Sequence, residues 1–406
     1  MILRPYQETG RDFLAGKRFA LLADEMRVGK TPQAILAAQK IGAESALVVC
    51  PAIACEHWRR EWRKWWPSAP SSNWPVVVSY DGAKNNRTEL LSRHWDVVIV
   101  DEAHFAKNPS AERTKLVYGK GGLGWHCDHL WALSGTPAPK HAGELWPMLR
   151  AFGAVGLDYA AFCRRYCTMN KWTGAIIGTN TYRIPELKAI LATIMLRRTR
   201  KEVAPEMPDI DFQFLEIDPT SHADLGAPSM LSDAEMLQWM SRNAATSSED
   251  RVDVAMAKAL PLVENIAFAL DNGLLQQTVV FGWHREPLQC LAQALHVRGI
   301  KCDVITGSTH ASQRVETQDA FRRGEIQVVV ANILAAGTAI DLSAASHGYF
   351  LELDWVPGNN LQAANRLISM QKSEKVTFDI ATWPGSADDR VQKVLMRRAK
   401  ELANLL

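Results

Sequence analysis

The sequence lacks the features that mark a chain for a membrane or for secretion. No apolar run approaches the roughly 18 residues of a transmembrane helix, and Met1-Ile2-Leu3-Arg4-Pro5 carries no signal-peptide pattern. It also lacks an excess of either charge, because 46 lysine and arginine residues stand against 44 aspartate and glutamate residues. The net charge of +2 means that any nucleic-acid surface must be a local patch. We expect a soluble chain in a cytoplasmic, intracellular setting.

Cysteine is sparse and shows no disulfide or zinc pattern. The seven cysteines are odd in number and stand among apolar neighbours, which is typical of reduced intracellular thiols. Cys163 and Cys167 are four residues apart, but no second ligand pair stands nearby, so we do not expect a zinc site.

Short apolar runs alternate with helical patterns along the chain. Runs such as 97–100 and 328–330 are apolar throughout, which is typical of parallel strands buried on both faces. This alternation predicts α/β domains with parallel sheets flanked by helices. The predicted strands are Phe19–Leu22, Ala46–Cys50, Val76–Ser79, Val97–Val100, Leu130–Leu133, Thr278–Phe281, Cys302–Ile305, Gln327–Val330, Tyr349–Leu353 and Thr377–Ala381.

The centre of the chain interrupts this alternation. Residues 218–253 are rich in Ser, Ala, Asp and Gly, with one helical pattern at 233–242. We interpret the polar piece 243–250 as a mobile surface connection. We expect a first domain at 1–208, a linker with a helical insertion at 209–260, and a second domain at 261–406.

A phosphate-binding loop is the most informative feature. Gly29-Lys30-Thr31 stands between an apolar run and a helical pattern. In such a loop the amides and the helix N-terminus face the phosphates, Lys30 reaches the β and γ oxygens, and the Thr31 hydroxyl helps to hold Mg²⁺. Arg27 stands where such loops usually have a small residue.

Two further motifs follow predicted strands. Asp101-Glu102-Ala103-His104 comes directly after the run 97–100, where α/β sheets bind ligands. Asp101 can hold Mg²⁺ through its water shell, and Glu102 can orient or deprotonate an attacking water. Leu133-Ser134-Gly135-Thr136-Pro137 follows the next strand. It either ends that strand in a turn or couples the phosphate site to a neighbouring surface.

The order of the motifs resembles that of superfamily 2 helicases and, more narrowly, of Swi/Snf-type ATPases. The segment 195–203 is similar to that family's signature after the first domain, and 162–167 and 385–389 resemble its annealing-helicase branch. The resemblance spans nearly the whole chain and indicates a minimal two-domain core without accessory modules. The ordered motifs are Arg4–Gln7, Asp24–Thr31, Asp101–His104, Ser134–Pro137, Gly307–Thr309, Ala335–Leu342 and Gln362–Arg366.

The resemblance implies two RecA-like domains, with ATP in the cleft between them and duplex DNA across both. Gln7 matches the glutamine that reads adenine, Asp101 and Glu102 match the metal-binding and water-activating pair, and Gly337 belongs to the coupling motif of the second domain. The implied catalytic residues are Lys30, Asp101, Glu102 and Arg366. The implied nucleotide contacts are Arg4, Gln7, Gly29, Lys30, Thr31, Gly337, Gln362 and Arg366, and the implied Mg²⁺ ligands are Thr31 and Asp101.

The implied function is an ATP-dependent translocase on double-stranded or branched DNA, with ATP and Mg²⁺ as cofactors. We expect a monomer that remodels or anneals DNA without reading base sequence. The alternatives are a nucleotide-gated DNA-binding module with little turnover and an RNA helicase.

The sequence departs from the family pattern at four places. Arg27 and Ala339 replace glycines, Ser369 stands where the family has a second arginine, and Gln371-Lys372 stand where it has Gly-Gln. An arginine finger contributes several orders of magnitude to phosphoryl transfer, so either hydrolysis is slow or another cation substitutes. Arg27 either offers a charge near the phosphates or projects outward. A non-glycine residue is disfavoured there if the backbone needs a positive φ.

Aromatic and basic patches admit two readings each. Trp58, Trp62, Trp65 and Trp66 form one helical stripe, which favours packing on the sheet over base stacking. The basic side chains on the stripe's helix either meet phosphates or form a solvated face, and the cluster after 196 makes either phosphate contacts or interdomain ion pairs. The arginines of the helix near 313–323 are expected on a solvated face. The pair after 281 is positioned to touch DNA, although a lone histidine there is more often structural. The residues of these four groups are Arg59, Arg60, Arg63, Lys64, Arg197, Arg198, Arg200, Lys201, Arg314, Arg322, Arg323, Trp283 and His284.

Overall fold

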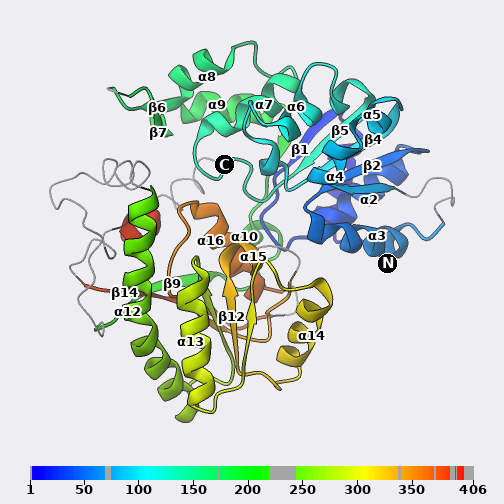
Figure 1. Ribbon diagram of the computed structural model, residues 1–406. Coiled ribbons are helices and arrows are strands. Elements are labelled where there is room, and N and C mark those ends of the chain that lie inside the picture. Colours follow the sequence, from blue (N-terminus) through cyan, green and yellow to red (C-terminus); the bar gives the residue numbers. More distant parts are fainter. Residues whose placement is uncertain are drawn as a thin grey trace. The chain divides into compact units, whose positions relative to one another are not determined.

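The chain folds into two compact units, the first ending at Pro205 and the second beginning at Glu206. The structure, a computed structural model (Figure 1), describes residues 2–68, 75–171, 173–218, 244–336, 340–369, 372–384, 389 and 391–396. Within these residues no helix combines the length and the apolar character needed to cross a bilayer.

The first unit contains a six-stranded sheet in the order β3-β2-β4-β5-β1-β8, and all its pairs are parallel. A separate antiparallel hairpin joins β6 and β7. The strands are β1 (Phe19–Leu22), β2 (Ala46–Cys50), β3 (Val76–Ser79), β4 (Trp95–Asp101), β5 (Cys127–Leu133), β6 (Cys167–Met169), β7 (Ile176–Thr179) and β8 (Met195–Leu196). The helices are α1 (Pro5–Ala15), α2 (Lys30–Lys40), α3 (Cys55–Trp65), α4 (Tyr80–Asn85), α5 (Arg87–Leu91), α6 (Glu112–Tyr118), α7 (Trp146–Ala151), α8 (Tyr159–Tyr166), α9 (Ile184–Ala192) and α10 (Arg200–Val203).

The second unit contains another six-stranded parallel sheet, in the order β11-β12-β10-β13-β14-β9. Its strands are β9 (Ile210–Glu216), β10 (Thr278–Gly282), β11 (Cys302–Ile305), β12 (Val328–Asn332), β13 (His347–Phe350) and β14 (Val376–Thr382). Its helices are α12 (Ala244–Asp271), α13 (Arg285–Val297), α14 (Ala311–Arg322), α15 (Ile333–Ala336) and α16 (Pro357–Ala364).

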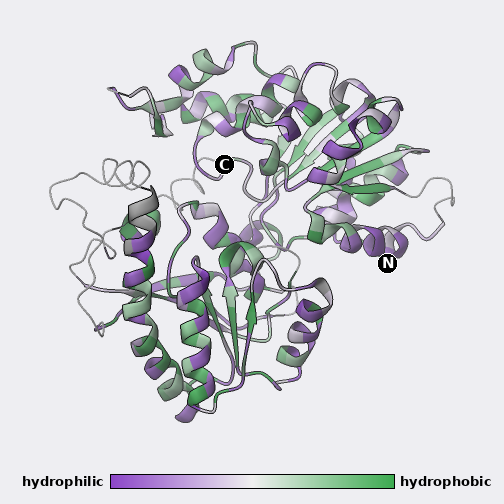
Figure 2. Ribbon diagram, in the orientation of Figure 1, coloured by the Kyte–Doolittle hydropathy of each residue, from purple (hydrophilic) through white to green (hydrophobic). Residues whose placement is uncertain are grey.

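The α/β fold class, with two parallel sheets flanked by helices, is confirmed. Every predicted strand overlaps an observed one, because fully apolar runs are buried on both faces of these sheets. Figure 2 shows hydrophobic residues concentrated on the strands and polar residues on the outer parts of many helices.

Two details of the expected organisation differ in the structure. Residues 210–216, expected in a linker, form β9 and pair in parallel with β14 of the second sheet. The polar piece 243–250 was expected to be a mobile connection, yet α12 already begins at Ala244. Alanine is the strongest helix former, and the pattern continues into the buried residues Ala255 and Ala259, so the helix extends upstream. The helical pattern at 233–242 lies outside the described residues.

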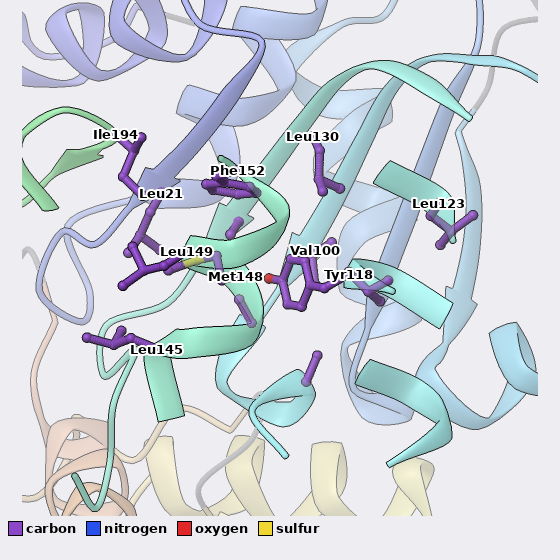
Figure 3. Close-up of a cluster of buried hydrophobic side chains, with 14 of the residues drawn as sticks. Leu21, Val100, Tyr118, Leu123, Leu130, Leu145, Met148, Leu149, Phe152 and Ile194 are labelled. Carbon is purple, nitrogen blue, oxygen red and sulfur yellow. The ribbon is translucent and has the colours of Figure 1, made fainter. Parts of the chain in front are cut away.

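The tryptophan stripe of α3 is part of the core, as the packing interpretation predicted. Trp58 and Trp62 are fully buried, and Trp66 belongs to the same core cluster, which also contains Val48 of β2. On the opposite face of that sheet, side chains from α6 and α7 cover the strands (Figure 3). Phe152, directly after α7, stacks on Phe19 of β1 with ring centroids 5.4 Å apart. These two packed layers cover both faces of the sheet and hold its strands, and therefore the carboxyl ends of the strands, in place.

Candidate functional site

Four neighbouring strands of the first sheet end at one edge and supply the candidate site. In sheet order they are β4, β5, β1 and β8, and all are parallel, so the segments after them lie along the same carboxyl edge. These segments are Glu102, next to Asp101 at the very end of β4, then Ser134-Gly135, the loop 23–29 and Arg197-Arg198. The sheet therefore brings together the phosphate-loop and acidic motifs that stand about 70 residues apart in the sequence.

Lys30 begins α2 and folds back over the loop that precedes it. Its Nζ donates hydrogen bonds to the carbonyl oxygens of Asp24 at 2.8 Å and Glu25 at 3.1 Å. Burial lowers the pKa of Lys30, and the carboxylates of Glu102, Asp24 and Asp101 oppose that shift. The ammonium group therefore lies in a low-dielectric site within the field of the acidic motif.

The loop backbone is left-handed at two residues. Gly29 has φ +81°, and a Cβ there would lie 2.4 Å from Nε2 of Gln7, so both conformation and space require glycine. Arg27 has φ 68°, in the region that disfavours any non-glycine residue. The backbone at position 27 has a positive φ, so a non-glycine residue is disfavoured there, as expected from the sequence for that case. Its side-chain direction stays a prediction.

The start of α1 is attached to the same loop. Gln7 is buried, and its Nε2 donates to the carbonyl oxygen of Val28 at 3.2 Å. The Tyr6 hydroxyl donates to that same oxygen at 3.0 Å. The Arg4 backbone N–H donates to Oε1 of Gln7 at 3.0 Å and fixes the amide orientation. The roles of Arg4 and Gln7 in nucleotide binding stay predictions, but the geometry ties them directly to the phosphate loop.

A buried ion pair holds the loop from the end of the first unit. Asp24 is fully buried, and Nε of Arg198 donates to its Oδ1 at 2.9 Å. The same guanidinium donates to Oε1 of Gln33 at 3.0 Å and to the carbonyl oxygen of Tyr6. A Cβ on Gly10 would lie 1.7 Å from the Gln33 side chain and 2.8 Å from Arg198. Gly10 therefore gives this network its room, and Arg198 joins α1, the loop and α2.

Two neighbouring arginines brace the same loop. Arg197 donates to the carbonyl oxygens of Ala23 at 3.0 Å and Gly135 at 3.4 Å. Arg200 is buried, lies 3.0 Å from Oε1 of Glu25 and donates its backbone N–H to the other carboxylate oxygen. The sequence interpretation of this basic cluster, as DNA contacts or interdomain ion pairs, is wrong for Arg197, Arg198 and Arg200. These side chains instead contact loop segments of their own unit.

The acidic pair sits at the end of β4 and is held by two aromatic side chains. The indole Nε1 of Trp58 donates to Oδ2 of Asp101 at 2.8 Å. The Tyr80 hydroxyl donates to the carbonyl oxygens of Asp101 at 2.9 Å and Glu102 at 3.2 Å. Burial and the neighbouring Glu102 charge raise the pKa of Asp101 to about 6, and the Trp58 hydrogen bond opposes them. Glu102 itself adopts φ 48°.

Trp58 is the site residue that sequence reasoning missed. Its place in an apolar helical stripe predicted burial, which is correct, but gave no sign that its N–H points at Asp101. The available signal was chemical, because a buried indole N–H needs an acceptor. Asp101, at the end of β4, provides this acceptor.

His104 and Ser134 connect two of the motifs. Nδ1 of His104 lies 3.0 Å from the Ser134 hydroxyl and 3.3 Å from Oε2 of Glu102. Burial lowers the pKa of His104 to about 3, so the ring is neutral at pH 7. The Thr136 backbone N–H also donates to the Ser134 hydroxyl at 3.2 Å. Ser134 therefore ends its strand in a turn and also contacts the acidic motif.

In the second unit, the two expected site residues that the structure describes lie after β13. Gln362 is buried in α16, and Arg366 follows in a short 3-10 turn, where its carbonyl accepts from the Leu342 N–H at 3.0 Å. Gly337, Ala339 and Gln371 lie outside the described residues. Lys372 is three residues beyond Ser369, and its Nζ donates to the carbonyl oxygens of Ser343 at 2.8 Å and Ala345. Lys372 thus braces the 343–345 loop of its own unit.

Two other basic positions of this unit are structural. Arg314 was expected on a solvated face, yet its guanidinium donates to the carbonyl oxygens of Thr306, Thr309 and Ala335. His284 lies with Nδ1 2.7 Å from Oε1 of the buried Glu352, so the structural interpretation of this histidine is confirmed. Arg322 and Arg323 are exposed and pair with neighbouring carboxylates, as expected of a solvated face.

The polar groups at the carboxyl edge of the first sheet fit a nucleoside triphosphate with Mg²⁺. Lys30 and the N-terminal amides of α2 suit phosphate oxygens. Among the described residues no group of three or more His, Cys, Asp or Glu side chains forms a ready-made metal cage. Mg²⁺ is usually bound through one or two carboxylates plus substrate phosphates and water, and Asp101 with Thr31 offers that set.

Fold and site together define an α/β protein with a phosphate loop and an acidic motif at one sheet edge. The SNF2-related domain family matches residues 6–73 and 71–225, and the helicase conserved C-terminal domain matches residues 261–371. The chain belongs to the SNF2-related family, as the order of its motifs predicted.

Individual relatives cover the whole chain at low identity. The chain is 27% identical over 425 residues to SWI/SNF-related matrix-associated actin-dependent regulator of chromatin subfamily A-like protein 1 of Xenopus laevis, covering 98% of this chain and 44% of that protein. It is 27% identical over 438 residues to DNA annealing helicase and endonuclease ZRANB3 of Bos taurus, covering 100% of this chain and 40% of that protein. Thus the chain spans less than half the length of either relative. A solved Sulfolobus solfataricus SWI2/SNF2 ATPase core in complex with dsDNA matches with 20% identity and a TM-score of 0.46, covering 100% of this chain and 93% of that one.

Proposed function

We propose that this chain is a DNA-dependent ATPase that moves along double-stranded DNA and remodels or anneals duplex or branched DNA. The observation that carries the proposal is the convergence of Lys30, Asp101 and Glu102 at one edge of the first sheet. Membership of the SNF2-related family supports the reaction, and the names of relatives that include a DNA annealing helicase support the substrate.

In this proposal each residue has a role that follows from its place. Lys30 exchanges its hydrogen bonds with the loop carbonyls for bonds to phosphate oxygens, so the loop opens as the nucleotide enters. Asp101 and Thr31 would hold Mg²⁺, which would supply positive charge against the developing phosphate charge. Glu102 orients or deprotonates the attacking water. Trp58 keeps one oxygen of Asp101 fixed and so orients the carboxylate.

The remaining roles follow from the family pattern. Gln7 and Arg4 bind the base beside the phosphate loop. Gly337, Gln362 and Arg366 act on the nucleotide from the second domain, and Arg366 supplies a positive charge to the γ-phosphate. We propose that the protein acts on the DNA backbone without reading base sequence.

The test is an ATPase assay on a panel of duplex, forked and single-stranded DNA and RNA. We expect duplex or forked DNA to stimulate hydrolysis, and Lys30→Ala or Glu102→Gln to abolish it. Matched controls are Lys40→Ala, at the exposed end of the same helix, and Glu112→Gln, an exposed carboxylate of the same unit. DNA-stimulated hydrolysis that survives both site changes would contradict the proposal, and stimulation by RNA alone would indicate an RNA helicase.

A nucleotide-gated DNA-binding module is the second candidate, and two observations favour it. Ser369 is not an arginine, and Lys372 is engaged with the carbonyls of Ser343 and Ala345. Arg27 also adopts a left-handed conformation in the phosphate loop, which is unfavourable for a non-glycine residue. This candidate predicts ATP-dependent DNA binding with negligible phosphate release, and a brisk steady-state rate on duplex DNA would exclude it. If the missing arginine limits turnover, Ser369→Arg raises the rate.

A further inference from the structure

Cys50 and Cys55 have sulfur atoms close to each other, and Cys55 is partly exposed. Among the cysteines of the described residues, no other pair has both properties. Their Sγ atoms are 3.6 Å apart, with Cys50 buried at the end of β2 and Cys55 half-buried as the first residue of α3. The short segment between them, 51–54, contains a single 3-10 turn. A disulfide needs about 2.05 Å between sulfurs, so closing the bond requires a local contraction of roughly 1.5 Å.

The electrostatics at the pair favour reaction at Cys55. The hydrogen bond from Cys50 and the nearby Arg59 guanidinium lower the pKa of Cys55 to about 7, although burial opposes them. The hydrogen bond with Cys55 and burial raise the pKa of Cys50. In contrast, burial raises the pKa of Cys127, Cys167 and Cys302. Cys55 therefore supplies the reactive thiolate and Cys50 the resolving thiol.

The pair is mechanically connected to the candidate site. Trp58 lies three residues after Cys55, on the first turns of α3, and its indole donates to Oδ2 of Asp101. Cys50 closes β2, the strand that pairs directly with β4, which ends at Asp101. A contraction between the two sulfurs pulls the start of α3 toward β2. That movement displaces the indole that orients Asp101.

We propose that Cys50 and Cys55 are an oxidation site that peroxide converts into a disulfide, and that this bond slows the ATP hydrolysis put forward as the proposed function. The Cys55 thiolate attacks one peroxide oxygen, and the other oxygen leaves as hydroxide and takes a proton to become water. The resulting sulfenic acid accepts attack by the Cys50 sulfur, and its hydroxyl leaves with the Cys50 proton as a second water. The two sulfurs together lose two electrons, which the peroxide gains.

The experiment treats the full chain with hydrogen peroxide and then with dithiothreitol. Trypsin releases residues 41–59 as one peptide that contains both cysteines, so the disulfide appears as the loss of two hydrogen atoms from that peptide. We expect this loss together with about a tenfold fall in DNA-stimulated ATPase rate, the scale of one lost hydrogen bond, and recovery on reduction. The Cys55→Ser variant should hydrolyse ATP at the same rate as the dithiothreitol-treated unaltered chain, and peroxide should not change that rate. The control Cys290→Ser, half-exposed in the second unit, responds like the unaltered chain.

Two results would overturn this inference when the reduced chain is an active ATPase. One is an unlinked 41–59 peptide under conditions that oxidise Cys290. Another is a linked peptide with an unchanged ATPase rate. If the reduced chain has no ATPase activity, the proposed function fails, and the oxidation site is judged separately by peptide mass and by amide hydrogen exchange in α3. In that case a linked peptide with faster exchange in α3 supports the site, and an unlinked peptide or unchanged exchange overturns it.

Discussion

The two units differ in the partners of the cations that hold their loops. In the first unit, Arg198 and Arg200 pair with the carboxylates of Asp24 and Glu25, which belong to the phosphate loop itself. In the second unit, Arg314 and Lys372 donate to backbone carbonyls of their own loops. The first unit therefore fixes its loop through ion pairs in addition to the main-chain acceptors of Lys30 and Arg197, whereas Arg314 and Lys372 use main-chain acceptors alone.

This difference tells us where substitutions do most harm. A buried ion pair that loses one partner leaves an uncompensated charge, which costs more than the loss of hydrogen bonds to neutral carbonyls. The loop of the first unit is thus the more sensitive to loss of a single cation. Among the described residues of the second unit, a comparable centre lies where Glu352 meets His284 and Arg251.

The largest effect is expected for Arg198→Met. The change leaves the fully buried Asp24 carboxylate without its main counter-ion and should lower the free energy of unfolding of the first unit by about 3 to 5 kcal/mol. Urea unfolding, with hydrogen exchange in β1 and β5 as the reporter of this unit, measures it. The double variant Arg198→Met with Asp24→Leu should recover much of the loss. A loss below about 1 kcal/mol would mean that Asp24 does not depend on this pair.

Glu352→Gln tests the comparable centre of the second unit. Burial raises the pKa of Glu352, but the His284 hydrogen bond and the Arg251 charge hold it below its ordinary value. A carboxyl whose pKa is lowered on folding contributes stability above its unfolded pKa and loses it as pH falls through the folded pKa. Removing the charge should therefore cost about 2 kcal/mol at pH 7 and flatten the loss of stability below about pH 4.5. Arg251 keeps its bond to the Leu353 carbonyl, which limits the cost.

Urea titrations of the second unit at pH 7 and at acidic pH provide the measurement. The matched control is Glu325→Gln, an exposed carboxylate of the same unit that pairs with Arg323. An equal cost at both pH values would show that the Glu352 charge contributes no linked stability.

Trp58→Phe is expected to act on chemistry more than on stability. The change removes the hydrogen bond from Trp58, which lowers the pKa of Asp101 against the effects of burial and of Glu102. The pKa of Asp101 therefore rises above about 6. Losing the donor to a buried carboxylate costs about 1 to 2 kcal/mol of stability. The pH profile of ATP hydrolysis should move to higher pH, because Asp101 must be ionised to hold Mg²⁺. Trp62→Phe, on the same buried stripe, should leave the profile in place.

The smallest effect is expected for Arg27→Gly. The left-handed conformation costs a non-glycine residue about 1 to 2 kcal/mol, and the greater freedom of glycine in the unfolded chain offsets about half of the gain. The net stabilisation is about 0.5 kcal/mol, read as a small rise in the urea midpoint. Gly153 has φ +72° with no atom within 4 Å of an added Cβ, so Gly153→Ala is the mirror control and should lower the midpoint. No rise for Arg27→Gly would mean that the side chain compensates for the strain.

Sequence periodicity was sufficient for the two sheets, because strands buried on both faces are apolar throughout. It also placed Lys30, Asp101 and Glu102, since short strand-ending motifs carry their chemistry in a few adjacent residues. It failed for Arg198, Arg314 and Trp58, whose roles depend on partners far along the chain. A basic cluster has the same local pattern whether it binds DNA or a buried aspartate. Only the fold, which places β8 beside β1, decides between those possibilities.

The contact between Arg198 and Asp24 has a consequence for synthesis of the chain. The two residues are 174 positions apart, so the ribosome makes the phosphate loop long before its counter-ion exists. Until Arg198 has emerged, the nascent domain cannot bury the Asp24 carboxylate against its counter-ion. The loop therefore matures only when the first unit is nearly complete. A fragment that stops before β8 would carry every residue from Gln7 to Glu102 and still lack a finished site.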